Sequence, residues 1–165
     1  MLILIMGVTA SGKTTVGTLL SRAIKWPFFD ADEFHSPANV AKMRSGVPLS
    51  DADRIPWIAS LRALISEQTL RNENVILACS ALKASYRDAL ASAAPLELIY
   101  LKADPELIRA RLGSRKGHFM SPDLIESQFL DLEEPQVAIT IPASLPPEEI
   151  VGIIRFKLGL DRLDD

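Results

Sequence analysis

The chain has 165 residues, a formal net charge of −3 and one cysteine. This length suits one compact domain that buries enough apolar surface to fold without disulfides or a structural metal. The lone Cys79 excludes an intramolecular disulfide and a cysteine-rich zinc site, and it favours a reducing, cytoplasmic location. The sequence lacks a Lys/Arg-rich block of the kind that binds nucleic acid, which argues against a nucleic-acid partner. The N-terminal apolar run is too short to span a membrane.

Short apolar runs that are typical of buried strands alternate along the chain with patterns that are typical of helices. This alternation predicts an α/β fold, in which a five-stranded parallel sheet carries helices on both faces. No linker or repeat divides the chain, so residues 1–165 are expected to form a single domain. The expected strands are 2–6, 27–30, 75–79, 96–101 and 137–141, and the expected helices are 13–24, 53–70, 84–93, 105–115, 122–130 and 147–158.

The first expected strand leads directly into a phosphate-binding loop with the pattern G-x-x-x-x-G-K-[ST]. Small residues let successive backbone N–H groups close on phosphates, and the following helix adds the positive end of its dipole. We therefore predict binding of a nucleoside triphosphate, with Lys13 on the β- and γ-phosphates and Thr14 as a magnesium ligand. The predicted nucleotide-binding residues are Gly7, Val8, Thr9, Ala10, Ser11, Gly12, Lys13, Thr14 and Thr15.

Two carboxylates, Asp30 and Asp32, follow at the end of the second expected strand. Ligands of parallel sheets bind at the carboxyl ends of the strands, and alternation along an extended chain points both side chains toward the γ-phosphate. Asp30 is the candidate for the magnesium shell, and Asp32 is the candidate for orienting and deprotonating an acceptor hydroxyl. Turn or helix-cap roles are the alternative for both residues.

Two segments differ from simple connections between elements. Segment 33–53, with a short helix expected near 39–44, predicts a small acceptor-binding insert, and segment 115–122 predicts a lid over the phosphates. Arg111 continues the apolar stripe of the helix before this lid, and Arg115 follows one turn later. A cation on a buried stripe needs an anion, so both arginines are predicted to stabilise the transferred phosphoryl group. A solvent-facing basic helix end is the alternative.

A second group of polar side chains predicts a site for an acceptor. Cations would bind a carboxylate and the remaining groups would bind hydroxyls, so a small hydroxy acid is the expected acceptor. Solvated surface and helix capping are the alternatives for each residue taken alone. The candidates are Asp32, His35, Asn39, Lys42 and Arg54, together with Ser80, Lys83 and Arg87 after the third strand.

With these residues in place, the chain resembles the gluconokinases, small P-loop kinases similar to adenylate and shikimate kinases. The resemblance runs from residue 2 to about residue 135, and Ala10 departs from it because such kinases usually have a glycine there. It rests on D-A-D-x-x-H-x-x-x-N-x-x-K-M from Asp30, G-V-P-L from Gly46, D-x-D-R-x-P-W from Asp51, C-S-A-L-K-x-x-Y-R-D from Cys79, R-K-G-H-F from Arg115 and S-Q-F-x-x-L-E from Ser127.

The resemblance implies a three-layer P-loop kinase fold, ATP and Mg²⁺ as cofactors, and a homodimer. It implies phosphorylation of D-gluconate at its 6-hydroxyl, which gives 6-phospho-D-gluconate for the pentose phosphate route. Similarity to shikimate kinases implies that Asp32 and Arg54 bind the acceptor, and the adenine-binding loop is expected near residues 142–144. Two alternatives remain: a kinase for another small hydroxy acid such as shikimate, and a non-catalytic switch module that senses ATP.

Overall fold

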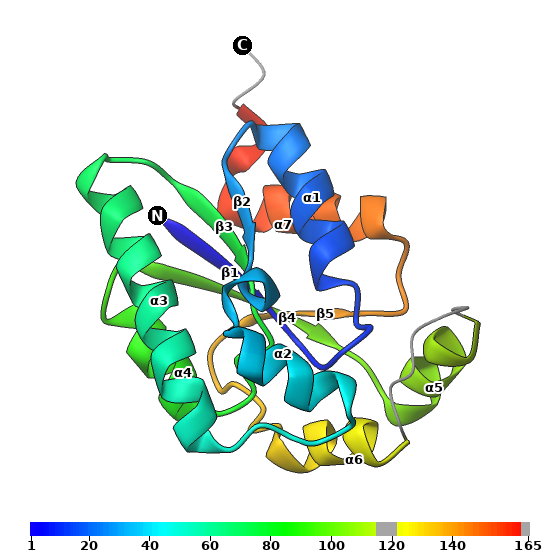
Figure 1. The fold of residues 1–165 in the computed structure, drawn as a ribbon. Coiled ribbons are helices and arrows are strands. Elements are labelled where there is room, and N and C mark those ends of the chain that lie inside the picture. The colour runs from blue at the N-terminus through cyan, green and yellow to red at the C-terminus, as the bar shows by residue number, and fades with distance from the viewer. Residues whose placement is uncertain (115–121, 163–165) are drawn as a thin grey trace.

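A parallel sheet forms the centre of the molecule in the computed structural model, which describes residues 1–114 and 122–162 (Figure 1). The strand order β2-β3-β1-β4-β5 places the first strand of the chain in the middle. This arrangement confirms the predicted α/β fold. The strands are β1 (Leu2–Met6), β2 (Phe28–Asp30), β3 (Val75–Ala78), β4 (Leu96–Lys102) and β5 (Ile139–Pro142).

Helices cover both faces of this sheet, as the apolar strand sequences require. Helices α1 and α7 pack together on one face, and α3 and α4 pack together on the other. Among the described residues, no helix combines the length and the apolar character needed to cross a bilayer. The helices are α1 (Lys13–Ile24), α2 (Pro37–Arg44), α3 (Asp51–Leu70), α4 (Ala84–Ala91), α5 (Pro105–Ser114), α6 (Pro122–Asp131) and α7 (Pro147–Leu158), with 3₁₀ turns at Ala31–Phe34 and Leu160–Arg162.

The carboxyl end of the sheet carries the elements that surround the candidate site. Helices α2, α5 and α6 lie at this end, near the turn that joins β1 to α1 (Figure 1). Helices α5 and α6 pack against the loops that follow β1 and β3 through a small apolar cluster. This cluster contains Val8, Leu82, Ile108 and Ile125. The expected phosphate loop and the insert at 33–53 therefore meet at one edge of the sheet, together with α5 and α6.

Several boundaries differ from expectation for local reasons. The chain does not stay extended after Asp30, because residues 31–34 form a 3₁₀ turn that the Asp30 side chain caps. Helix α3 begins two residues earlier than expected, because Ser50 and Asp53 form a reciprocal capping box. The expected lid over 115–122 and Arg115 lie outside the described residues, apart from Pro122, which begins α6.

One glycine allows helix α1 to approach the sheet closely. A Cβ on Gly17 would lie 2.2 Å from Cε2 of Phe28, whereas a Cβ on Gly152 in α7 would meet nothing within 4 Å. We expect Gly17→Ala to lower the free energy of unfolding by about 1–3 kcal/mol through overpacking. Gly152→Ala should raise it by about 0.5–1 kcal/mol, because alanine favours an exposed helix interior. Urea unfolding of both variants tests this pair, and equal effects would contradict the close packing.

Candidate active site

The loop between β1 and α1 has the backbone of a phosphate cradle. Gly12, which precedes α1, has a φ of +104°, and Gly7 has a φ of +150°. A Cβ on Gly7 would lie 2.7 Å from Ser11 Oγ and 2.8 Å from the carbonyl oxygen of Leu101. Glycine is therefore required at position 7 both for its backbone conformation and for the close approach of β4. The loop ends at the N-terminus of a 12-residue helix, where a phosphate is favoured.

Ala10 adopts the left-handed backbone conformation, although alanine has a Cβ that disfavours it. Its φ is +56°, and this conformation costs an alanine roughly 1 kcal/mol more than a glycine. Ser11 beside it is buried, and its backbone N–H donates to the carbonyl of Val8 at 3.3 Å. The surrounding packing thus holds the turn in shape at the position where the resembling kinases usually have glycine.

Lys13 lies folded over the loop that precedes it. Its Nζ donates to the carbonyl oxygen of Val8 at 2.9 Å, on the side where phosphates would lie. Desolvation lowers the pKa of Lys13, and the nearby Asp32 opposes this change. A triphosphate would supply the negative charge that this ammonium group lacks in the surrounding loop.

Thr14 and Asp30 lie next to each other, as a magnesium site beside the loop requires. Thr14 Oγ1 donates to Asp30 Oδ2 at 2.6 Å, and Asp30 Oδ1 accepts from the backbone N–H of Asp32 at 3.0 Å. A hydroxyl and a carboxylate are the oxygen donors that Mg²⁺ prefers, and this ion takes its other ligands from water and phosphate. The donor set fits, and no group of three or more acidic, histidine or cysteine side chains among the described residues offers a cation cage elsewhere.

Arg111 reaches the phosphate loop from helix α5. Its Nη1 donates to the carbonyls of Ala10 at 3.0 Å and Ser11 at 3.1 Å, and its Nη2 donates to the carbonyl of Ala143 at 2.5 Å. One guanidinium group therefore joins the phosphate loop to the segment after β5, where the adenine-binding loop is expected. This position beside the loop agrees with the inward-facing stripe on which the sequence places Arg111.

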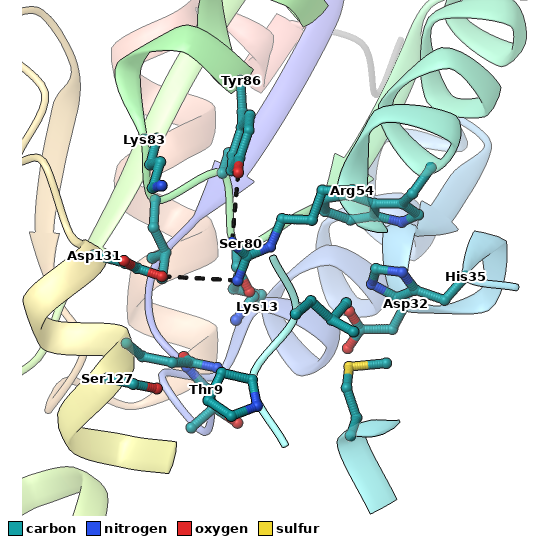
Figure 2. Close-up of a pocket in the computed structure, with 17 residues that line it drawn as sticks. Thr9, Lys13, Asp32, His35, Arg54, Ser80, Lys83, Tyr86, Ser127 and Asp131 are labelled. Carbon is teal, nitrogen blue, oxygen red and sulfur yellow. Dashed lines mark hydrogen bonds and ion pairs between the residues drawn. The ribbon is translucent and has the colours of Figure 1, made fainter. Parts of the chain in front are cut away.

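A continuous pocket opens beside the phosphate loop (Figure 2). Side chains enter it from the loop, from the 3₁₀ turn after β2, from α3, from the segment after β3 and from α6. It thus joins the predicted phosphate-transfer residues to several predicted acceptor residues. Its polar and charged lining residues are Thr9, Lys13, Asp32, His35, Arg54, Ser80, Lys83, Tyr86, Ser127, Gln128 and Asp131.

Asp32 and His35 lie at one side of this pocket (Figure 2). Desolvation raises the pKa of Asp32, and Lys13 partly offsets this rise. The His35 ring stacks on Trp57 at a centroid distance of 4.4 Å, and Trp57 Nε1 donates to the carbonyl of Ala31 at 2.7 Å. Desolvation lowers the pKa of His35, which favours its neutral ring, and the nearby Asp32 opposes this change. His35 Nδ1 is buried and has no hydrogen-bond partner among the described residues.

Cations gather at the other end of the pocket, each with an acidic partner. Arg54 Nη1 donates to Tyr86 Oη at 3.4 Å, and Arg54 Nη2 lies 3.7 Å from Asp131 (Figure 2). Lys83 Nζ donates to Asp51 at 2.8 Å, and Tyr86 Oη donates to the same carboxylate. The bond from Lys83 and that from Tyr86 hold the pKa of Asp51 below its usual range.

Two predicted acceptor residues, Asn39 and Lys42, instead join the insert to helix α3. Asn39 is buried and its Nδ2 donates to the backbone carbonyl of Asp53 at 2.8 Å. Lys42 Nζ donates to both carboxylate oxygens of Asp53 at 2.9 Å. The bond from Lys42, followed by those from the backbone N–H and the hydroxyl of Ser50, lowers the pKa of Asp53 to about 2. The structure therefore does not bring Asn39 and Lys42 to the pocket.

Arg87 also lies away from the pocket, although Lys83 on the same segment lines it. The Arg87 side chain is buried, and its Nη1 donates to the carbonyls of Ala81 and Leu82 at 2.9 Å each. Burial lowers the pKa of this guanidinium group. Arg87 thus supports the backbone that leads from β3 to α4 and does not line the pocket.

We expect Arg87→Met to lower the free energy of unfolding by about 1–3 kcal/mol, because two buried carbonyl groups lose their donor. The matched control is Arg109→Met on an exposed position of α5, which should change stability by less than about 0.5 kcal/mol. Chemical unfolding measures both variants. A stable Arg87→Met protein would show that these carbonyl bonds contribute little.

Helix α6 supplies pocket residues that the site prediction omitted. Gln128 Oε1 accepts from the backbone N–H of Thr9 in the phosphate loop at 2.6 Å, and Asp131 faces Arg54. Tyr86 and Asp51 complete the cationic end. The motifs S-Q-F-x-x-L-E, C-S-A-L-K-x-x-Y-R-D and D-x-D-R-x-P-W contain Gln128, Tyr86 and Asp51 and were the available signals for them, whereas Asp131 stands at an unspecified position of the first motif.

Comparison with known proteins relates this geometry to a family. Residues 2–134 match the family model described as an AAA domain. A probable gluconokinase from Mus musculus is 43% identical over 167 aligned positions, which cover 87% of this chain and 91% of the mouse protein. The chain belongs to the gluconokinase family. The resemblance predicted from the sequence is therefore confirmed.

Solved structures of similar proteins share the fold of this gluconokinase-family chain. A sugar kinase from a Janibacter species is 36% identical with a TM-score of 0.90, covering 97% of this chain and 95% of its own. A gluconokinase from Sinorhizobium meliloti is 36% identical with a TM-score of 0.82, covering 99% and 97% of the two chains. Both similarities extend over nearly the whole length of each chain.

Proposed function

We propose that this chain transfers the γ-phosphoryl group of ATP to the 6-hydroxyl of D-gluconate, giving 6-phospho-D-gluconate and ADP. The observation that carries the proposal is the continuous pocket. It has the phosphate loop and Asp32 at one end, and Arg54 and Lys83 at the other. A linear hydroxy acid would place its carboxylate on the cations and its terminal hydroxyl near Asp32. The likeness to gluconokinases supports gluconate as this acid.

The residues of this chain have separate tasks in the proposed reaction. Backbone N–H groups of the loop, Lys13 and Arg111 hold the triphosphate and stabilise the charge that develops during transfer. Bound Mg²⁺, held by Thr14 and Asp30, would supply further charge neutralisation between the phosphates. The outer lid that the sequence places at 115–122, including Arg115, belongs to this proposal as the cover of the phosphate site.

Asp32 is placed to handle the acceptor proton. The acceptor oxygen bonds to the γ-phosphorus, the bond from that phosphorus to the β,γ-bridging oxygen breaks, and the hydroxyl proton passes to Asp32. A raised pKa makes this carboxylate a better proton acceptor near neutral pH. His35 Nδ1 and the Ser80 hydroxyl are available for the hydroxyls along the acceptor chain.

We also propose that residues 1–165 act as one kinase domain with an insert at 33–53, and that the protein is a cytoplasmic homodimer. The family resemblance supports the dimer, and the lone Cys79 supports a reducing compartment. Burial raises the pKa of this thiol to about 12, which keeps it unreactive and suits a core residue.

An acceptor panel in a coupled assay for ADP release tests the reaction. D-gluconate should give a higher kcat/KM than other sugar acids, shikimate or a nucleoside monophosphate, because its carboxylate can pair with the cations of the pocket and the chain is similar to gluconokinases. A higher kcat/KM for shikimate would assign the chain to another hydroxy acid. If no acceptor stimulates turnover, the chain is an ATP-sensing module instead.

Asp32→Asn tests the proposed proton acceptor. We expect kcat with gluconate to fall by roughly a hundredfold or more, because an amide of similar size cannot take the proton. ATP affinity, measured by titration calorimetry, should remain close to that of the wild type. The matched control is Glu33→Gln, an exposed neighbour outside the pocket, which should keep wild-type kinetics. Unchanged turnover in Asp32→Asn would remove Asp32 from the mechanism.

A further inference from the structure

The cationic end of the acceptor pocket already holds carboxylates of the protein itself. Lys83 is paired with Asp51, and Arg54 lies between Asp51 at 3.8 Å and Asp131 at 3.7 Å. Together with Asp32, these acids match the three cations of the pocket, Lys13, Arg54 and Lys83. An acceptor carboxylate that enters this end must therefore compete with resident anions for the same cations.

At its position in α6, the Asp131 carboxylate has no evident role in stabilising the fold. It is the last residue of α6, where a negative charge opposes the helix dipole. Its side chain is 39% exposed, so packing does not require it either. Its ion pair with Arg54 is the interaction that accounts for its place, and that pair lies on the wall of the pocket (Figure 2).

The geometry of these pairs suits exchange with a ligand. Both Arg54 contacts exceed hydrogen-bonding distance, so neither acid forms a tight bidentate pair with the guanidinium group. The Asp51 side chain is 64% exposed, which lets water replace its contacts at little cost. A substrate carboxylate that bonds Arg54 directly can therefore displace the resident acids.

We propose that Asp51 and Asp131 set the charge selectivity of the acceptor site. They offset the positive charge of Arg54 and Lys83, so that a single acceptor carboxylate binds with moderate affinity and more highly charged molecules are disfavoured. The phosphorylated product carries more negative charge than gluconate, so the same two acids weaken the binding of the product. This inference rests on the proposed gluconate kinase activity and adds residues that control its specificity.

Kinetics of Asp131→Asn and Asp51→Asn test the proposal at saturating ATP. In each variant the KM for gluconate should fall about threefold, the size expected when an exposed ion pair no longer competes. The inhibition constant of 6-phospho-D-gluconate should fall by at least the same factor. The matched control is Glu148→Gln, which removes an exposed carboxylate from the first turn of α7 on the other face of the sheet. It should leave the KM unchanged.

A neutral ligand separates charge competition from a structural effect. D-glucitol has the hydroxyls of gluconate but no carboxylate, so its inhibition constant against gluconate should stay the same in both variants. A change in pocket shape would alter the binding of both gluconate and glucitol. In an Arg54→Ala background, Asp131→Asn should no longer lower the KM for gluconate, because the shared cation is gone.

The outcomes distinguish this inference from the proposed function. Absence of gluconate turnover by the wild type would overturn the proposed function. Wild-type turnover with an unchanged or higher KM for gluconate in both variants would overturn only the charge-selectivity inference, and a higher KM would show that the acids bind acceptor hydroxyls instead. Equal shifts for glucitol and gluconate would also overturn it.

Discussion

The carboxyl end of β1 is the fixed point on which the rest of the site depends. All five residues of this strand are fully buried, and it lies between β3 and β4 in the middle of the sheet. The chain must turn there within a few residues to begin α1, and the backbone N–H groups of that turn become available to an anion. Because the neighbouring strands run parallel, the segments after β2 and β3 arrive at the same edge. Phosphate binding and acceptor binding are thus consequences of one topology.

The acceptor half depends on a different support, the stack of His35 on Trp57. Trp57 is buried in the second turn of α3 and its Nε1 donates to the carbonyl of Ala31, so α3 fixes the 3₁₀ turn that carries Asp32. Arg54, less than one turn earlier on α3, reaches into the same pocket toward Tyr86 and Asp131. One helix therefore supports both the turn that carries Asp32 and the cation Arg54.

Most of the fold could be predicted because its signals are local. The glycines of the phosphate loop and the apolar runs of the strands are visible in the sequence, and α1 and α7 have the predicted bounds. The acceptor residues were harder to predict, because spacing places residues on one helix face without telling which neighbour that face meets. Lys83 and Arg87 are four residues apart, yet Lys83 precedes α4 in an extended conformation and only Arg87 lies within the helix. The two side chains therefore diverge: Lys83 lines the pocket, and Arg87 bonds the backbone carbonyls of Ala81 and Leu82.

The bond between Lys42 and Asp53 also affects how the protein responds to acid. Because the folded pKa of Asp53 is depressed to about 2, its stabilising contribution is present above the unfolded value of 3.8 and is lost only as the pH falls through the folded value. The insert thus remains attached to α3 in mildly acidic solution. His35 differs, since its lowered pKa means that the unfolded chain takes up a proton first as the pH falls below 6.5. In mild acid, His35 therefore lowers the free energy of unfolding, whereas Asp53 still contributes to it.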